Sequence, residues 1–330
     1  MSASRDPDVV SLHQLEDLVV AVPYCLGFRP VESLVVAAIT GRRGRLSFTM
    51  RIDLADPGDE AALAAECARR MSAAKADSVI AFVFSSDEPV DMHLPHAGLI
   101  AELKRQLRMP LRDAVLVGAD RFWSYTCTDP VCCPAAGRQV DPSSAGATSV
   151  AAAHALRGHA VLPSRDDLVA TVQPVAGIAA DSMDQALERA AADYLRLGPD
   201  EFTRTARRLI DDLAQRWADP RAVLTHDEAA VLGMALHDIV LRDEVLLHAG
   251  RDDEVWRRLL GALARLVQPP LDAPTCTLLA WVAYLQGDGV IAMTALDRAL
   301  ASDPDYTMAG LLASALNGQL PPDELRRLIA

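Results

Sequence analysis

Lysine and aromatic residues are scarce in this sequence. Lys75 and Lys104 are its only lysines, and aromatic side chains make up 5% of the chain. Basic residues number 32 against 45 acidic ones, which gives a formal net charge of -13 at pH 7. Because nucleic-acid affinity depends largely on clustered Lys and Arg, we expect no nucleic-acid partner. The scarcity of aromatic residues predicts cores built from aliphatic side chains and alanine.

Long apolar runs and familiar catalytic motifs are also missing. No apolar run approaches the length of about 20 residues that a membrane-spanning helix needs, so we expect no membrane contact. The N-terminus mixes Arg5 with Asp6 and Asp8 and lacks the apolar region of a signal peptide, which predicts a cytoplasmic protein. P-loop, dinucleotide-binding, metalloprotease and nucleophile-elbow motifs do not occur, so those enzyme classes are not leading interpretations.

The first part of the chain alternates strand-like and helix-like segments. Apolar or alternating runs predict strands at 34–39, 46–54, 78–84, 114–118 and 122–126. Helical periods predict helices before the first strand, from about residue 60, and around 99–107. This order predicts an α/β N-terminal domain with a mixed sheet over residues 1–146.

Local signals predict details near the start of this domain. A capping box over 11–14 predicts a helix start, and Pro23 is expected to end that helix. Gly27 is suited to a positive φ in the loop that follows. In the alternating strand, every second residue from Leu46 to Leu54 is apolar, so these side chains are expected to share one face of the sheet.

The second part of the chain, residues 147–330, shows helical periods and no convincing strand. A stretch rich in Ser, Gly and Pro at 141–147 marks the predicted boundary. The predicted helices cover 166–172, 183–197, 201–217, 227–247, 254–267, 275–286 and 290–301. The last two, with their small residues Ala283, Ala292 and Ala299, resemble one tetratricopeptide repeat. We therefore expect an all-α C-terminal region that ends in a tetratricopeptide-like helix pair.

The segment from Trp123 to Pro134 concentrates residues capable of unusual chemistry. Cys127, Cys132 and Cys133 supply three of the six cysteines of the chain within seven positions. In a reducing compartment, such clusters bind metal or undergo redox chemistry more often than they form persistent disulfides. Zinc is therefore the candidate cofactor, and Cys127, Cys132, Cys133 and Asp129 are the candidate metal ligands.

The spacing of these cysteines leaves several interpretations open. Structural zinc sites usually pair cysteines two residues apart, and Cys127 and Cys132 are five apart. The adjacent side chains of Cys132 and Cys133 are expected to diverge, which disfavours a shared ion. A fourth ligand would have to come from Asp129 or from a histidine; the histidines considered are His93, His96, His154 and His159. Buried structural thiols, a metal site, a redox pair and a thiolate nucleophile all stay open.

Two further groups of residues are candidates for a site in the α/β domain. Asp53 and Asp120 each follow a predicted strand, where paired carboxylates could hold Mg²⁺ or only end the strand. Asp53 is also expected on the same face as Arg51, close enough for an ion pair. Tyr24, Arg29 and Trp123 are candidate ligand-binding residues, because Arg29 could meet a phosphate or carboxylate beside aromatic side chains; a rigid packed corner is the alternative.

Several motifs along the chain together form a specific pattern. They are Pro23-x-x-Leu26-Gly27-Phe28-x-Pro30-x-x-Ser33-Leu34-Val35-Val36, Arg51-x-Asp53-Leu54, Trp123-Ser124-Tyr125-x-Cys127 with Cys132-Cys133-Pro134, Arg242-Asp243, and the ending from Gly287 to Pro304. This pattern resembles an actinobacterial family that is catalogued as domain of unknown function 4192, over nearly the whole chain. The scarcity of lysine agrees with such an origin. The resemblance implies no established activity, cofactor or partner.

Three hypotheses about function follow. The leading one is a cytoplasmic, non-catalytic assembly or regulatory protein that binds a protein partner through its helical half. The second is an enzyme with a metal- or thiol-dependent site at the strand ends, for which Asp53, Asp120 and Cys127 are the candidate catalytic residues. The third is a zinc- or redox-responsive module. The sequence pattern does not determine the oligomeric state.

Overall fold

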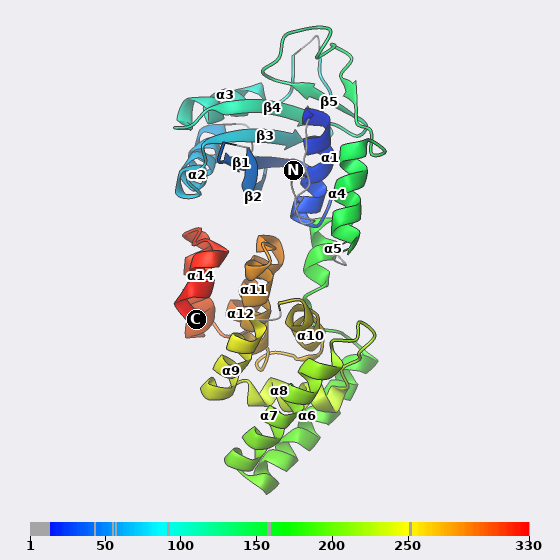
Figure 1. The fold of residues 1–330 in the computed structure, drawn as a ribbon, viewed down its shortest axis with the longest axis vertical. Helices are drawn as coiled ribbons and strands as arrows, with labels where there is room; N and C mark the ends of the chain where they lie inside the picture. Colours follow the sequence, from blue (N-terminus) through cyan, green and yellow to red (C-terminus); the bar gives the residue numbers. More distant parts are fainter. Residues whose placement is uncertain are drawn as a thin grey trace, which may run out of the picture. The chain divides into compact units, whose positions relative to one another are not determined.

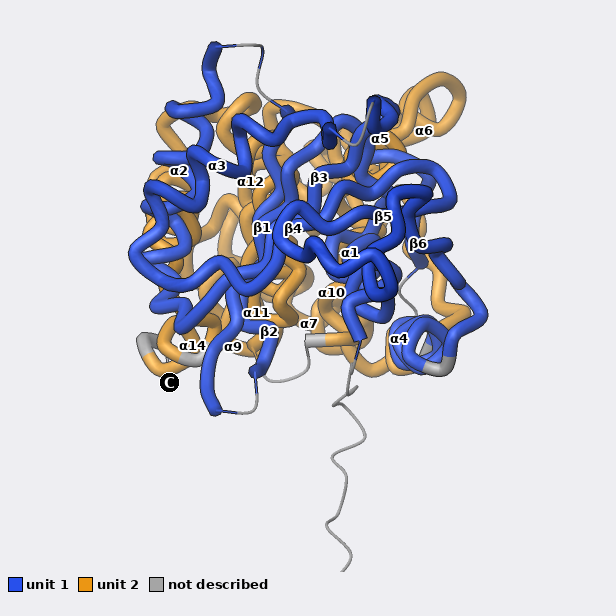
Figure 2. Tube along the Cα trace, turned by 90° about the horizontal axis from the view of Figure 1, so that it is seen from above, with its two compact units in different colours: residues 1–165 blue, residues 166–330 orange. Residues whose placement is uncertain are grey.

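The computed structural model divides into two compact units, residues 1–165 and 166–330, which Figure 2 shows in separate colours. Within it, residues 14–42, 44–54, 56, 58–90, 93–156, 160–250 and 253–329 are described. In these ranges, no helix is both long enough and apolar enough to cross a membrane. The capping box expected at 11–14 lies mostly outside the described residues.

The N-terminal unit is built on a mixed sheet of six strands in the order β2-β1-β3-β4-β5-β6. The strands are β1 (Ser33–Thr40), β2 (Arg45–Asp53), β3 (Ser78–Phe84), β4 (Leu111–Val117), β5 (Arg121–Ser124) and β6 (Arg138–Gln139). Neighbouring strands are antiparallel except β3 and β4, which are parallel. A mixed sheet was expected from the sequence, and β6 was not predicted.

Helices cover both faces of this sheet (Figure 1). They are α1 (Leu15–Leu26) on one face and α2 (Glu60–Ala73) and α3 (Ala97–Gln106) on the other, while α4 (Ala145–Leu156) packs on α1. On one face, Cys67 and Met71 of α2 and Leu103 of α3 pack with the inward residues of β1, β3 and β4. On the other face, Val22 of α1 lies against β1 and β3, where it lines a crevice with Phe82. Strands β1 and β3 are buried on both sides, which accounts for their continuous apolar runs.

The expected alternation of β2 is interrupted by a bulge. Ala38 pairs with Phe48, but the next residue of β1, Ile39, pairs with Leu46, so Ser47 is the extra residue. Because side chains alternate along a strand, one extra residue moves the preceding ones to the opposite face. Leu46 accordingly lines the crevice under α1, whereas Phe48 packs on the core beneath α2 and α3. The prediction that Leu46 shares a face with Leu54 was wrong for this reason.

Helix α1 was expected to end at Pro23, but it does not. Pro23 lies inside the helix, which continues to Leu26, and the helix ends at Gly27 with φ of 77°. Leu26 is 3% exposed, so its burial in the core holds the last turn in place beyond the proline. The left-handed glycine is the actual stop signal, and its positive φ was predicted correctly.

The N-terminal unit extends beyond the predicted boundary at 146. Helix α4 packs against α1, with the ring of His154 centred 5.4 Å from that of Tyr24. Further along, Leu162 exchanges backbone hydrogen bonds with Gly27 and Arg29, at 2.9 and 3.0 Å. These contacts attach residues up to 165 to the sheet unit, so the polar stretch at 141–147 is a loop within the unit.

The described residues of the C-terminal unit form helices joined by turns and loops, with no strand. Its helices are α5 (Arg165–Ala170), which begins at the boundary, α6 (Ile178–Leu197), α7 (Pro199–Arg216), α8 (His226–Ala235), α9 (Ile239–Ala249), α10 (Asp253–Leu266), α11 (Ala273–Leu285), α12 (Gly289–Ser302), α13 (Thr307–Asn317) and α14 (Pro322–Ile329). One helix was expected over 227–247, but α8 and α9 occupy that stretch. Asp238 separates them, because its carboxylate caps α9 by accepting the N–H groups of Val240 and Leu241 at 2.9 and 3.3 Å.

The core of this unit centres on α11. All but one of its residues are buried, as expected for a helix that is apolar all round. It packs most extensively on α12, and Ala283, Ala292 and Ala299 are fully buried between neighbouring helices. The expected close helix pair is therefore present, and its assignment as a tetratricopeptide repeat stays a prediction.

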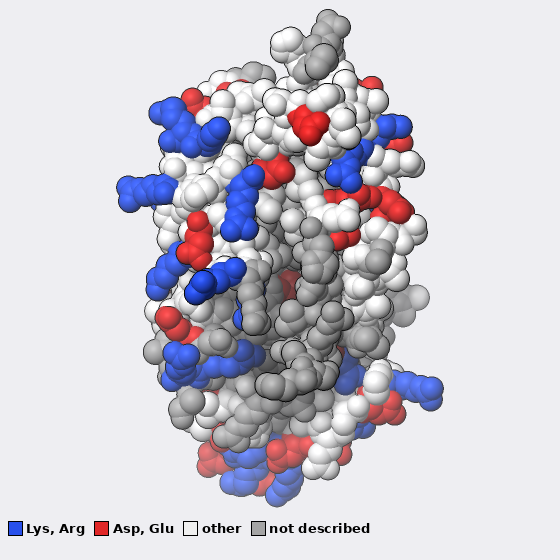
Figure 3. Space-filling model, turned by 45° about the horizontal axis from the view of Figure 1, so that its top comes forward, with Lys and Arg blue, Asp and Glu red and all other residues white. Residues whose placement is uncertain are grey.

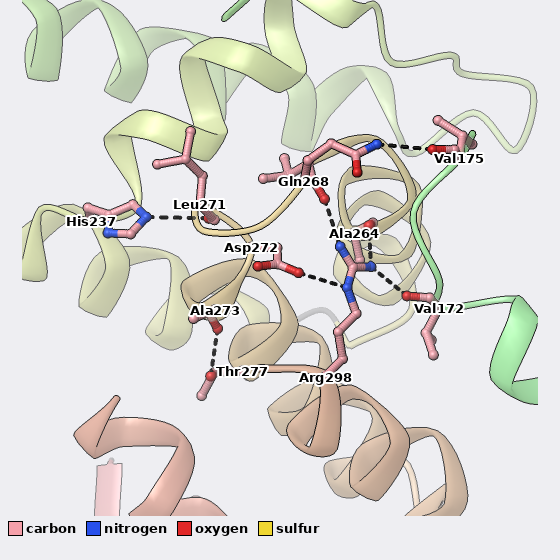
Figure 4. A network of polar contacts seen from close by, with 11 residues as sticks. Val172, Val175, His237, Ala264, Gln268, Leu271, Asp272, Ala273, Thr277 and Arg298 are labelled. Carbon is pink, nitrogen blue, oxygen red and sulfur yellow. Dashed lines mark hydrogen bonds and ion pairs between the residues drawn. The ribbon is translucent and has the colours of Figure 1, made fainter. Parts of the chain in front are cut away.

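A buried arginine ties four segments of this core together (Figure 4). The Arg298 guanidinium on α12 donates to the Asp272 carboxylate at 2.8 Å. It also donates to the carbonyl oxygens of Val172, Ala264 and Val267 at 2.6, 2.6 and 2.7 Å. The Arg298 side chain is 6% exposed and that of Asp272 is 0% exposed. The two charges thus compensate each other, and the guanidinium closes the C-terminal turn of α10.

Many of the other described arginines form ion pairs, several of them at the surface. Typical pairs join residues three apart on one helix, such as Arg105 with Glu102 and Arg204 with Glu201. Figure 3 shows side chains of both signs on the displayed face of the molecule. Exposed pairs of this kind contribute little to the free energy of folding. They are therefore a minor factor in the stability of the fold.

Candidate metal centre

Trp123 anchors the loop that carries the cysteines. It lies on β5, and its indole N–H donates to the Ala135 carbonyl at 3.1 Å. Its ring lies against Gly137, where an added Cβ would come within 2.5 Å of the ring. Gly137 also has φ of 74°, a conformation that other residues rarely adopt. Trp123 therefore closes the loop from β5 to β6 by packing on a position that only glycine fits.

A polar cluster positions the first cysteine. The Asp113 carboxylate on β4 accepts the hydroxyl groups of Ser124 and Thr126 at 2.9 and 2.6 Å. The Ser124 hydroxyl in turn accepts the backbone N–H of Cys127 at 3.0 Å. These contacts fix the chain as it leaves the sheet, so the Cys127 thiol has a defined starting position.

Asp129 forms the turn that brings the other two cysteines back. Its carboxylate accepts the backbone N–H of Val131 at 2.9 Å and that of Cys132 at 3.5 Å. Its carbonyl oxygen accepts the N–H of Cys133 at 2.7 Å. An aspartate that bonds to the amides following it is a standard turn former. The structure thus uses Asp129 to shape the loop, and it does not join the cluster of metal-ligand atoms that the described cysteines form.

The three thiols converge on one point. The Sγ atoms of Cys127, Cys132 and Cys133 all lie within 4.8 Å of one another. Cys132 is exposed, and the other two are partly buried. The expectation that Cys132 and Cys133 diverge was wrong, because the turn at Asp129 curls the backbone and directs both side chains towards Cys127. Among the described residues, these three cysteines are the only group of three or more histidine, cysteine or carboxylate side chains close enough to share an ion.

The surroundings of the thiols separate their acidities. The backbone N–H of Asp129 hydrogen-bonds the Cys127 sulfur and, with the Cys133 thiol, lowers the pKa of Cys127. Burial and the hydrogen bond to Cys127 raise the pKa of Cys133 to about 12. Backbone N–H groups that point at a sulfur stabilise its thiolate form. Cys127 therefore ionises before Cys133, and a bound cation would replace the remaining thiol protons.

The structure does not bring Asp53 and Asp120 together. Asp53 ends β2 and pairs with Arg51 at 2.5 Å, as expected from their shared face. Arg51 also donates to the Ser33 hydroxyl at 2.8 Å, which links two motifs of the family resemblance. Asp120 follows β4, and three strand spacings, about 14 Å, separate β2 from β4. A metal ion shared by these two carboxylates is not supported by this arrangement.

Tyr24, Arg29 and the histidines also lie apart from the thiols. Tyr24 packs on His154, and Arg29 is an exposed residue whose backbone pairs with Leu162. His96 contacts Ser85, and His93 and His154 do not belong to the cysteine group. His159 lies outside the described residues. Of the ligand-binding candidates, only Trp123 lies beside the cysteine loop.

Sequence analysis missed a second polar cluster where β3 ends. The Glu32 carboxylate accepts the hydroxyl groups of Ser85 and Ser86 at 3.0 and 2.8 Å and the Ser86 N–H at 2.7 Å. His96 Nε2 lies 3.3 Å from the Ser85 hydroxyl. Glu32 and His96 both have positive φ, at 40° and 58°. Adjacent serines after a buried strand were the available signal, but the partners come from distant parts of the chain.

Comparison with known proteins assigns the chain to a family without assigning an activity. A family model described as Domain of unknown function (DUF4192) matches residues 16–323, which is nearly the whole chain. The match includes the opening motif, the cysteine loop and the helical unit. No curated protein and no solved structure matches.

Proposed function

The chain belongs to the DUF4192 family, and because that membership brings no assigned activity, we propose from the thiol geometry that it is a non-catalytic, zinc-responsive module. The observation that carries the proposal is the convergence of the Cys127, Cys132 and Cys133 sulfurs within 4.8 Å. Thiolates are the donors that zinc prefers in structural and regulatory sites.

The spacing of the sulfurs suits a zinc ion after a small adjustment. Zinc–sulfur bonds of about 2.3 Å at tetrahedral angles place sulfurs about 3.8 Å apart. The sulfurs lie within 4.8 Å, so none has to move closer to another by more than about 1 Å. Two of them, on Cys132 and Cys133, belong to a turn with exposed residues, where such a movement meets little packing resistance.

A regulatory role follows from the place of the site in the fold. The cysteine loop joins β5 to β6, and its closing contact is the packing of Trp123 on Gly137. Binding of an ion would hold residues 127–133 in one rigid turn. The availability of metal would then determine whether this surface loop is ordered. We place the protein in the cytoplasm, where thiols stay reduced and available to metal.

Elemental analysis combined with thiol titration tests this proposal. Protein purified with a phosphine reductant and then exposed to zinc is expected to hold one zinc per chain, with three thiols protected from a thiol reagent. Cys127→Ser should lose most of the metal. Cys25→Ser is the matched control, because Cys25 is also an exposed cysteine but lies on α1, outside the cluster. Metal-free protein with freely reactive thiols would overturn the proposal.

Binding of a protein partner by the helical unit is a second candidate function. Ile239, Val240 and Leu247 of α9 are 63%, 62% and 43% exposed, an unusual density of apolar side chains on one short helix. The paired change Ile239→Ser and Val240→Ser should abolish retention of a stoichiometric partner. Val131→Ser, a change at an exposed valine of the other unit, should not. Equal retention by both variants would contradict this candidate.

A further inference from the structure

The three sulfurs come from one short segment, which limits how much of an ion they can surround. All belong to the stretch from Cys127 to Cys133, which the turn at Asp129 folds back on itself. Cys132 is exposed, so solvent reaches the cluster at that thiol. A fourth ligand can therefore approach the cluster there.

No fourth protein ligand is in place within the part of the chain that the structure describes. The group of potential ligand atoms contains the three sulfurs alone. The nearest carboxylate in sequence, that of Asp129, already accepts the N–H groups of Val131 and Cys132. Zinc in proteins is almost always four-coordinate, and a site with three protein ligands takes its fourth ligand from solution.

We infer that an ion held by these cysteines keeps its fourth coordination position open and binds there a thiolate supplied from outside the chain. This inference rests on the proposed zinc site. A divalent ion with three thiolates already carries a net negative charge, so it acidifies a bound water less than an ion held by neutral imidazoles does. The open position therefore suits ligand exchange better than hydrolysis, and a soft sulfur donor completes the four-sulfur set common in zinc sites.

The exchange step balances without electron transfer. The bond between zinc and water breaks, a bond between zinc and the incoming sulfur forms, and the thiol proton passes to the buffer. The incoming sulfur can belong to a small-molecule thiol or to a cysteine of a second copy of this chain. Cys25 is the other exposed cysteine of the chain, so it is the donor that a second copy would offer.

Cobalt(II) substitution provides the test, because charge-transfer absorption from sulfur to cobalt grows with each cobalt–sulfur bond. The full chain is loaded with cobalt in a phosphine reductant and titrated with 2-mercaptoethanol, with ethylene glycol as the oxygen control. Completion of the coordination shell from three sulfurs to four should raise the band by about one third in a saturable manner. Ethylene glycol should leave it unchanged, and gel filtration should show that cobalt stays bound.

The outcomes separate the sources of sulfur and the two proposals. A monomer whose band rises with 2-mercaptoethanol supports a small-molecule thiol. A dimer with the four-sulfur band, which Cys25→Ser converts to a monomer with the weaker band, supports a thiolate from a second copy. Bound cobalt whose band responds neither to the thiol nor to Cys25→Ser overturns this inference and leaves the metal site intact. Failure to bind cobalt or zinc at all overturns the proposed function instead.

Discussion

Replacing Arg298 with methionine is expected to destabilise the helical unit severely. The change removes all four hydrogen bonds of the guanidinium, to Asp272, Val172, Ala264 and Val267. It also leaves the Asp272 carboxylate, which is 0% exposed, without a compensating charge. Breaking a buried ion pair in this way typically costs about 3–5 kcal/mol. The three carbonyl groups that lose their donor place Arg298→Met in the upper half of that range.

Thermal unfolding followed by circular dichroism measures this effect. For a unit of this size, each kcal/mol lowers Tm by about 2–4 °C, so a loss of about 4–5 kcal/mol corresponds to roughly 8–20 °C. The double variant Arg298→Met with Asp272→Leu removes both charges and is expected to recover more than half of the loss. If Arg298→Met lowered the free energy of unfolding by less than about 1 kcal/mol, the reasoning would be refuted. A double variant as unstable as Arg298→Met alone would refute it as well.

Three further predictions concern the N-terminal unit. Burial raises the pKa of Glu32, but the hydrogen bonds from Ser86 and Ser85 outweigh burial and lower that pKa below 4.5. The ionised Glu32 carboxylate therefore stabilises the fold fully above the ordinary glutamate pKa. This stabilisation is lost as pH falls through the lowered pKa. Acid unfolding curves of the wild type and Glu32→Gln should differ at neutral pH and converge in acid; a difference that grows in acid would contradict this assignment. Gly137→Ala should lower the free energy of unfolding in urea by more than about 2 kcal/mol, because the added Cβ meets the Trp123 ring. Gly98→Ala, which adds a Cβ in open space on α3, should be neutral or stabilising. Equal effects of the two changes would show that the Trp123 contact is unimportant. Zinc at a hundred times its Kd should raise the free energy of unfolding by about 2.7 kcal/mol in the wild type but not in Cys127→Ser, as measured by calorimetry; equal stabilisation of both would place the ion elsewhere.

The regular elements of the sheet unit could be predicted because burial patterns determine them. Strand β3 was expected at 78–84 and is found at Ser78–Phe84, since an apolar run flanked by polar residues allows few other arrangements. Leu46 could not be placed, because a bulge changes the face of a strand without leaving a sequence signal. Pro23 was misjudged because tertiary packing of Leu26 overrode the local preference of proline.

The candidate site was only half predictable. Clustering of Cys127, Cys132 and Cys133 was evident from the sequence, and so was their association with Trp123. Their convergence was not, because it depends on a turn whose geometry arises from the Asp129 hydrogen bonds. The Glu32 and Ser85 cluster was missed for a related reason: its members are separated by 53 positions and meet only through strand pairing.

The claim that three sulfurs share one ion is tested most directly by mass spectrometry of the intact chain under non-denaturing conditions. After reconstitution with zinc and removal of excess metal, the account predicts a single species heavier than the apo chain by one zinc, less the protons of the thiols it replaces. Cys127→Ser, Cys132→Ser and Cys133→Ser should each appear as the apo mass, while Cys25→Ser should keep the ion. An apo mass for the reconstituted wild type, or zinc retained by all three cluster variants, would contradict the account.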